Sequence, residues 1–324
     1  MNRYRLVHST EFVYDGPVSE SYNEVRLRPI HDDRQSCLSF RLLTSPASRG
    51  TSYRDAWGNW IHLFNILPEH CRLKVEAESV VLAHDAPEPP GESLPLADLN
   101  ARREELLEEF YDFMAPSSYV PFLPQLGDIV CAAGKRGDGS VGGFAQAASD
   151  YIHENFSYVK GATHVNSSIA DPLALLAGVC QDFAHVLLGV VRSRGLPARY
   201  VSGYLAPENE SEPGARQEEV IGGRASHAWV EVFLPDFGWI GLDPTLGKPV
   251  GLRHIRLACG RDYGDVPPVR GVYKGRVGQR LSVDVLVRPA LDGEGRELLS
   301  EISEGPHEPP QVTERPQQPG QQQQ

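Results

Sequence analysis

One stretch, residues 178–205, restricts the folding of this chain more than any other. Its apolar side chains fall three, four, seven, eight and eleven residues after Cys180, at Phe183, Ala184, Leu187, Leu188 and Val191. This is the spacing of one face of an α-helix. The run from Arg194 to Pro197 supplies a basic residue, a glycine and a proline, which together end a helix. The pattern predicts that Cys180 occupies the first turn of a helix packed on a core, with a strand over residues 200–205 after it.

The first turn of a helix is a chemically active place for a thiol. The backbone N–H groups there have no intrahelical acceptor, and the helix dipole favours negative charge. Both effects favour the thiolate, which is the nucleophilic form of cysteine. A lone cysteine is more commonly a small core residue, so Cys180 needs a partner base before it can be called a nucleophile.

Two short strands joined by a tight turn offer that base and its partner. His227 begins an alternating run, and Asp243 ends the strand that returns after the turn. If Glu231 pairs with Trp239, His227 falls opposite Asp243, and the two side chains share a face. A slip of one residue would put them on opposite faces. The pattern predicts an imidazole held by a carboxylate, as cysteine nucleophiles require.

The motifs around these residues are Gly-Val-Cys-Gln-Asp-Phe-Ala-His at Cys180, His-Ala-Trp-Val-Glu-Val at His227 and Gly-Trp-Ile-Gly-Leu-Asp-Pro-Thr at Asp243. In this order they resemble the transglutaminase-like superfamily, and more narrowly its bacterial branch of cysteine proteases. The resemblance implies that Cys180 is the nucleophile, His227 the general base and acid, and Asp243 the orienting carboxylate. It extends to an N-terminal β domain with Asp55-Ala-Trp-Gly-Asn and to Asp262-Tyr-Gly-Asp-Val-Pro-Pro-Val-Arg-Gly after the core.

Together, pattern and resemblance predict an α+β fold. We expect a papain-like, transglutaminase-type core, in which a helix bearing Cys180 packs on an antiparallel sheet bearing His227 and Asp243, preceded by a small β-sandwich-like domain. The predicted organisation is an N-terminal β domain at 1–82, a Pro-rich linker at 83–97, a catalytic domain with a C-terminal strand at 98–290, and a disordered Pro/Gln-rich tail at 291–324. Asp15-Gly-Pro is predicted to be a turn within the β domain.

The composition excludes several classes of binding partner and cofactor. A formal net charge of -12 argues against nucleic acid or an anionic membrane as the main partner, and no apolar run approaches the roughly 18 residues of a membrane span. The five cysteines are scattered without a CxxC pair, which argues against a zinc cluster or a disulfide framework. We therefore expect a cytoplasmic protein with no cofactor and no metal that acts on a protein or peptide substrate. The oligomeric state is left open.

The sequence departs from the animal transglutaminases in one place. Those enzymes use an upstream tryptophan to stabilise the oxyanion, but here no tryptophan lies between Trp60 and Trp229. The backbone N–H of Cys180 is the physical candidate for one oxyanion donor, and the second donor stays unassigned. No calcium-loop spacing is present either, so calcium dependence is not expected.

Other chemistry-bearing residues have plainer interpretations. His185 is predicted to lie on the surface or to make a subsidiary contact, and Asp182 to complement the helix N-terminus rather than to bind substrate. Trp229 and Trp239 are predicted to pack the hairpin. The remaining cysteines are interpreted as structural: Cys37, Cys71, Cys131 and Cys259.

The predicted chemistry is acyl transfer on amide bonds through a thioester. Hydrolysis is favoured because water is always present and no amine site is visible, whereas a transglutaminase would use a second amine. A non-catalytic peptide-binding scaffold is the alternative from another class, although a scaffold needs none of Cys180, His227 and Asp243 together. An acidic segment from Glu208 to Glu219 would favour cationic substrates if it borders the cleft.

Overall fold

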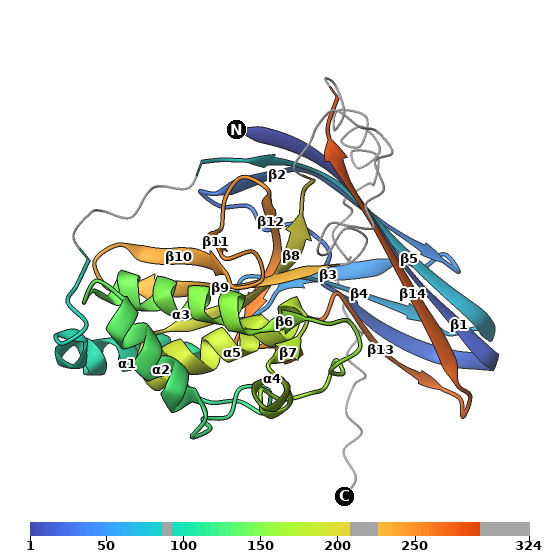
Figure 1. Cartoon of the computed structure of the whole chain (residues 1–324). Coiled ribbons are helices and arrows are strands. Elements are labelled where there is room, and N and C mark those ends of the chain that lie inside the picture. The colour runs from blue at the N-terminus through green and yellow to red at the C-terminus, as the bar shows by residue number, and fades with distance from the viewer. Residues whose placement is uncertain (86–92, 208–225, 292–324) are drawn as a thin grey trace, which may run out of the picture.

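The computed structural model describes residues 1–85, 93–207 and 226–291 (Figure 1). The acidic segment from Glu208 to Glu219, most of the predicted linker and nearly all of the predicted tail lie outside the described residues. A curled sheet of seven strands lies on one side of the molecule, and a five-stranded sheet covered by helices lies on the other (Figure 1). This is the predicted α+β fold.

The strands of the curled sheet are β1 (Asn2–Val25), β2 (Gln35–Ser45), β3 (Gly50–Arg54), β4 (Trp60–Ile66), β5 (His70–Ala83), β13 (Val269–Lys274) and β14 (Gln279–Pro289). The long strand β1 is its spine. The first part of β1 pairs antiparallel with β5 and β14, and its last part pairs with β4 and β13. Alternate side chains of β1, such as Tyr4 and Leu6, are buried, as the period-two pattern predicts.

The predicted turn at Asp15-Gly-Pro is wrong, because β1 runs straight through it. The pairing of β1 with β5 is interrupted between Val13 and Val18, and the proline lies in that gap. A proline cannot donate to a sheet ladder, so it is tolerated where the ladder is already broken. The signal that resembled a turn therefore marks an irregularity inside one strand.

The C-terminal strand, which was predicted to lie in the catalytic domain at 98–290, belongs instead to the curled sheet. β14 pairs with β1 over eleven residue pairs, from Tyr4 beside Pro289 to Tyr14 beside Gln279. Without β14 and β13, one side of β1 would present unpaired backbone groups at a sheet edge, which proteins avoid. The sequence pattern identifies the strand but contains no information about which sheet it completes.

The second unit contains helices α1 (Arg103–Met114), α2 (Leu126–Arg136), α3 (Val141–Asn155), α4 (Ala170–Leu175) and α5 (Cys180–Ser193), with 3-10 turns η1 (Leu99–Arg102) and η3 (Tyr263–Asp265). Its strands are β6 (Ser157–Tyr158), β7 (Ala177–Gly178), β8 (Ala198–Leu205), β9 (His227–Leu234), β10 (Gly238–Asp243), β11 (Lys248–Pro249) and β12 (His254–Gly260). The five-stranded sheet has the order β11-β10-β9-β8-β12. Among the described residues, no helix is long and apolar enough to cross a membrane.

The helix that begins with Cys180 is the centre of this unit. α5 packs on β8 and β9 and is flanked by α2 and α3. It is buried on nearly all sides, including at His185, which the sequence was expected to leave at the surface. The His185 ring packs against Tyr119 and Tyr200, and its Nε2 accepts a hydrogen bond from the Tyr263 backbone N–H at 3.1 Å. Of the two predicted alternatives, the surface position is wrong because η3 folds back over that face of the helix, whereas the subsidiary contact is present.

Side-chain amides of the curled sheet bind the outer edge of β12. The Gln35 amide exchanges two hydrogen bonds with the backbone of Arg256, both at 2.8 Å. The Asn59 amide does the same with Cys259, at 2.7 and 2.8 Å. Each amide imitates the backbone of a neighbouring strand. The Asp55 carboxylate in turn holds the Asn59 amide at 2.9 Å, so the segment Asp55-Ala-Trp-Gly-Asn serves as a joint between the two sheets.

A buried ion-pair cluster lies at the same joint. Glu231 of β9 is fully buried and pairs with Arg199 and Arg256, with N···O distances of 2.6 and 2.7 Å. Arg34, directly before β2, approaches the same carboxylate at 3.7 Å. A buried carboxylate is tolerated because several cations surround it. Glu231 thus connects strands β8, β9 and β12 to the chain segment that leads into β2.

Candidate active site

Cys180 is the first residue of α5 and is 9% exposed. Strand β7 delivers the chain to this point, and the Asp182 carboxylate fixes the helix start. It accepts hydrogen bonds from the Val179 backbone N–H at 2.8 Å and from the Thr163 hydroxyl at 2.5 Å. Burial raises the pKa of Asp182, and these two hydrogen bonds oppose that rise. Asp182 therefore supports the helix N-terminus, in line with its sequence-based interpretation.

Gly178 allows this close approach. A β-carbon at this position would lie 2.6 Å from the Asp182 carboxylate oxygen, which is too close for any side chain. The glycine in front of the cysteine motif is thus required by the carboxylate that holds the helix start. The result is a helix start that is fixed at the Val179 N–H and at Gly178, directly before the Cys180 thiol.

His227 and Asp243 meet at the ends of β9 and β10. The His227 Nε2 atom lies 2.7 Å from Asp243 Oδ2, and both side chains are fully buried. The predicted register of the hairpin is wrong by two residues, because Glu231 pairs with Gly241 rather than with Trp239. The predicted pairing would leave one residue for the turn, which is too few for a hairpin. A two-residue shift keeps each side chain on its own face, so His227 reaches Asp243 along a diagonal.

The Asp243 carboxylate is hydrogen-bonded at both oxygens. Its Oδ1 accepts from the backbone N–H groups of Thr245 and Leu246 at 2.9 and 3.2 Å. Its Oδ2 faces Nε2 of His227 and, at 3.1 Å, Nε2 of His254. Burial would raise the pKa of Asp243, but the hydrogen bonds from His227 and His254 and their charges hold it well below its usual range. The carboxylate stays ionised in a buried position.

The same contacts set the charge of His227. Burial acts to lower the pKa of His227, whereas Asp243 and the Cys180 side chain act to raise it, and the outcome is a pKa of about 10. Its Nδ1 atom is buried and makes no hydrogen bond of normal geometry within the described residues. Cys180 thus lies near enough to influence the ring without a completed hydrogen bond. Such contacts are often long before substrate binds.

Tyr158 is a site residue that sequence reasoning missed. It lies on β6, which pairs in parallel with β7 just before Cys180, so that Tyr158 stands beside Gly178. Burial and the nearby charges of Cys180 and Asp182 raise the pKa of Tyr158 to about 12. Its hydroxyl therefore keeps its proton and can donate a hydrogen bond. Nothing in the sequence links this two-residue strand to Cys180, because its pairing with β7 depends on the folded chain.

The predicted hairpin tryptophans do pack the hairpin and its surroundings. Trp229 is fully buried, and the Trp239 ring contacts Phe110, Phe113 and Phe233. The structural interpretation of the other cysteines holds only in part, because Cys71 and Cys131 are exposed while Cys259 is buried and Cys37 is partly buried. An exposed cysteine that forms no disulfide does not contribute to a hydrophobic core, so Cys71 and Cys131 are not structural residues. All five cysteines are free thiols.

Three side chains of types that can bind metal come together in the site. Ligand atoms of His227, Asp243 and His254 lie within 4.8 Å of one another. The hydrogen bonds described above already account for this cluster, since both carboxylate oxygens accept from two donors each. Two imidazole N–H groups that point at one carboxylate need no ion between them.

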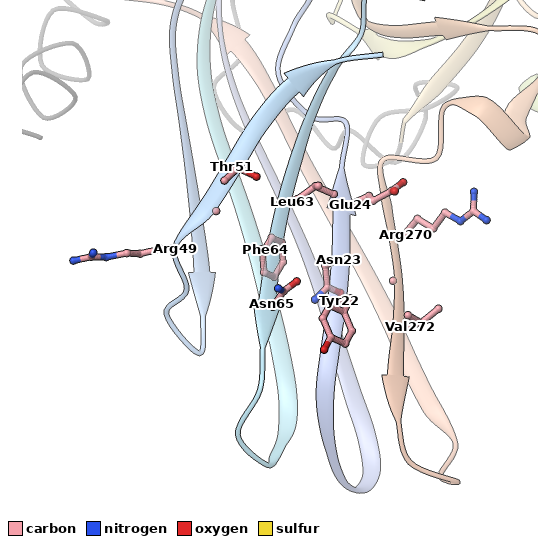
Figure 2. Close-up of a pocket in the computed structure, with 12 residues that line it drawn as sticks. Tyr22, Asn23, Glu24, Arg49, Thr51, Leu63, Phe64, Asn65, Arg270 and Val272 are labelled. Carbon is pink, nitrogen blue, oxygen red and sulfur yellow. The ribbon is translucent and has the colours of Figure 1, made fainter. Parts of the chain in front are cut away.

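A hollow of about 610 Å³ lies elsewhere, in the curled sheet and lined by residues of and beside β3, β4, β1 and β13 (Figure 2). Its walls include Tyr22, Phe64 and Val272, with Arg49 and Arg270 towards its sides (Figure 2). None of the candidate catalytic residues lines it. Cys180, His227 and Asp243 lie together at the N-terminus of α5, away from this hollow.

Comparisons with known proteins agree with the fold. Residues 4–82 match the family model described as the bacterial transglutaminase-like N-terminal region, and residues 131–244 match that of the transglutaminase-like superfamily. An uncharacterised protein of Mycobacterium leprae is 37% identical over 287 residues, which covers 88% of this chain and 98% of that protein. A solved structure from Cytophaga hutchinsonii, described as a candidate cysteine protease, superposes with a TM-score of 0.63 at 19% identity and covers 88% of this chain and 90% of its own.

A shorter match concerns a protein of known name. The protein-glutamine gamma-glutamyltransferase of Pseudomonas aeruginosa is 35% identical over 100 residues, which is 29% of this chain and 14% of that protein.

The fold and these matches define a member of the transglutaminase-like superfamily. Because the N-terminal region matches as well, the chain belongs to the bacterial branch in which a β domain precedes the core. The resemblance noted from the sequence motifs is confirmed.

Proposed function

We propose that this protein is a cysteine-dependent hydrolase of amide or peptide bonds that works through a thioester. The observation that carries the proposal is the buried 2.7 Å contact between His227 and Asp243, formed beside a cysteine at the start of a buried helix. A nucleophile, a base and a group that orients the base are the parts such chemistry needs.

The mechanism follows from the contacts. His227 binds Asp243 through Nε2, which leaves Nδ1 to take the Cys180 proton. The thiolate attacks the substrate carbonyl, and the imidazolium then gives its proton to the leaving amine, which departs and leaves a thioester. Water, deprotonated by His227, attacks the thioester and releases the carboxylic acid and the thiol. Asp243 stabilises the imidazolium in both half-reactions.

An oxyanion forms in each half-reaction and requires donors. The backbone N–H of Cys180, at the helix start, is one donor. We assign the second to the Tyr158 hydroxyl, which keeps its proton beside the Cys180 thiolate and lies on the strand next to the cysteine motif. This donor would take the place of the upstream tryptophan that the chain lacks.

The first test needs no substrate. Limited alkylation with iodoacetamide, followed by peptide mass mapping, should label Cys180 faster than Cys71 and Cys131. Those two thiols are exposed and serve as internal controls, because accessibility alone would make them react first. Faster labelling of the exposed pair at every pH would contradict an activated Cys180 and return it to the core.

Transfer to an amine is the second candidate, favoured by the match to the Pseudomonas aeruginosa protein-glutamine gamma-glutamyltransferase. Turnover of a glutamine-containing peptide library by the wild type and by Cys180→Ala, with and without an added primary amine, separates the two reactions. We expect carboxylic acid products that the amine does not divert. Amide-linked products that dominate at millimolar amine would instead identify a transferase.

The proposed setting is a reducing one, such as the cytoplasm, with a protein or peptide as substrate. Free thiols at Cys71 and Cys131 on the surface favour a compartment that keeps cysteines reduced. Fractionation of cells that produce the tagged full-length chain tests this, and recovery in an oxidising compartment would contradict it.

A further inference from the structure

A second histidine reaches the catalytic carboxylate from the far side of the sheet. His254 begins β12 and pairs with Leu205 of β8, whereas Asp243 ends β10, two strands further along the sheet from β8. Nevertheless, the two side chains meet at 3.1 Å, and the His254 side chain is only 5% exposed. No sequence motif marks His254, and the mechanism proposed above does not require it.

Packing explains how His254 is directed to this point. The Trp229 ring lies across β8 at Gly203, where an added β-carbon would be 2.4 Å from the indole. The ring then meets His254 edge-on, with centroids 5.2 Å apart at an angle of 77°. Only glycine at position 203 leaves room for an indole between β9 and β12. The imidazole of His254 is thus supported on one side by a rigid, buried wall.

The backbone also selects the tautomer of His254. The Gly251 backbone N–H donates to the ring nitrogen Nδ1 of His254 at 3.2 Å. The backbone N–H of His254 donates to the Gly251 carbonyl at 2.9 Å. A nitrogen that accepts a hydrogen bond carries no proton, so in the neutral ring the proton resides on Nε2. That proton points at Asp243 Oδ2.

We propose that His254 is a positioning residue of the catalytic unit, which donates through Nε2 to Asp243 and holds that carboxylate ionised and in line with His227. This inference rests on the proposed cysteine hydrolase function. The working unit is then Cys180, His227, Asp243 and His254 in a chain of contacts. His254 touches neither the thiol nor the site of bond cleavage, and it acts only through Asp243.

Loss of the His254 side chain would change both the charge and the position of the Asp243 carboxylate. Without the His254 donor, Asp243 Oδ2 keeps one partner in a buried site, and its ionised form loses a charge-assisted hydrogen bond. The carboxylate also loses a contact that prevents rotation. The titratable side chains facing it are His227 from β9 and His254 from β12, with the Cys180 thiol beyond His227. A less firmly held carboxylate stabilises the imidazolium less, so the thiolate forms at higher pH.

The test compares two variants of the full chain. His254→Phe keeps an aromatic ring against Trp229 but removes the donor, whereas His254→Gln keeps an N–H near the position of Nε2. The readout is the rate of Cys180 alkylation by iodoacetamide between about pH 4 and pH 9. The acid limb is the low-pH part of this profile, in which the alkylation rate rises with pH. For His254→Phe we expect the acid limb to move up by about one pH unit, which makes labelling about tenfold slower at a fixed pH on that limb. His254→Gln should retain the wild-type limb.

The outcomes separate the two hypotheses. If wild-type Cys180 labels no faster than Cys71, the proposed function fails. If the wild type is activated and His254→Phe shows an unchanged or lower acid limb, the positioning role of His254 is overturned while the hydrolase proposal stands.

Proton NMR provides a second measurement that does not depend on the variant with Phe. Wild-type protein should show two low-field resonances from imidazole N–H groups bound to Asp243, and His254→Gln should lose one of them. A single such resonance in the wild type, unchanged in His254→Gln, would also overturn the inference.

Discussion

At the scale of single residues, the charge of His227 connects stability with chemistry. A base with a pKa of about 10 stays protonated over most of the pH range, provided that Asp243 remains ionised and Cys180 is near. The His227 ring is therefore positively charged beside the Cys180 side chain, and a positive charge in that position favours the reactive form of a cysteine.

This charge predicts how stability depends on pH. The pKa of His227 in the folded state is raised from 6.5 to about 10, so its contribution is complete below about pH 6.5 and is lost as the pH rises through 10. The free energy of unfolding, measured with urea at about pH 6, 8 and 10, should fall more steeply for the wild type than for His227→Gln. Parallel curves for the two proteins would show that His227 is not charged in the fold.

The Tyr158 hydroxyl can be separated from nucleophile activation. Tyr158→Phe removes one oxyanion donor and should lower kcat by about 100-fold, because such donors act on the charge that develops in the transition state. Iodoacetamide forms no oxyanion, so the alkylation rate of Cys180 should stay at the wild-type value. A fall in both rates would show that Tyr158 supports the thiol itself, and a fall in neither would remove it from the site.

At the scale of elements, the sequence predicted the helix of Cys180 well because periodicity is a local property. The hairpin was predicted with the wrong register, yet His227 and Asp243 were placed on the same face, since a two-residue error preserves alternation. His254 and Tyr158 could not be found in this way. Each reaches the site through strand neighbours that are distant in sequence, and His185 is buried by η3, which follows it by more than seventy residues.

The start of α5 depends on one glycine, which gives a sharp test. Gly178→Ala places a methyl group 2.6 Å from the Asp182 carboxylate and should displace it, at a cost of about 1–3 kcal/mol. Both the Tm and the alkylation rate of Cys180 should fall. Gly127→Ala in α2, where an added β-carbon meets nothing within 4 Å, is the matched control and should be neutral or slightly stabilising. Equal behaviour of the two variants would contradict this account of the helix start.

At the scale of the whole molecule, two side-chain amides join the catalytic sheet to the curled sheet. Asn59→Leu leaves the N–H and C=O of Cys259 buried without partners, which should cost about 2–5 kcal/mol. Differential scanning calorimetry should show a lower Tm or a separation into two transitions. Asn65→Leu, at an exposed position in β4, serves as the control and should have little effect. An unchanged, single transition in Asn59→Leu would mean that the joint is held by other contacts.

The return of β13 and β14 to β1 has a consequence for biosynthesis. Strand β1 is synthesised long before its partner β14, which is completed only at Pro289. About 200 residues separate the end of β5 from that point, so translation leaves one side of β1 open for roughly 10–40 seconds. The helical unit can form in that interval, and the curled sheet closes around an already folded neighbour. A nascent chain stalled before β13 should therefore bind chaperones through its first strand, and release from them should coincide with synthesis of β14.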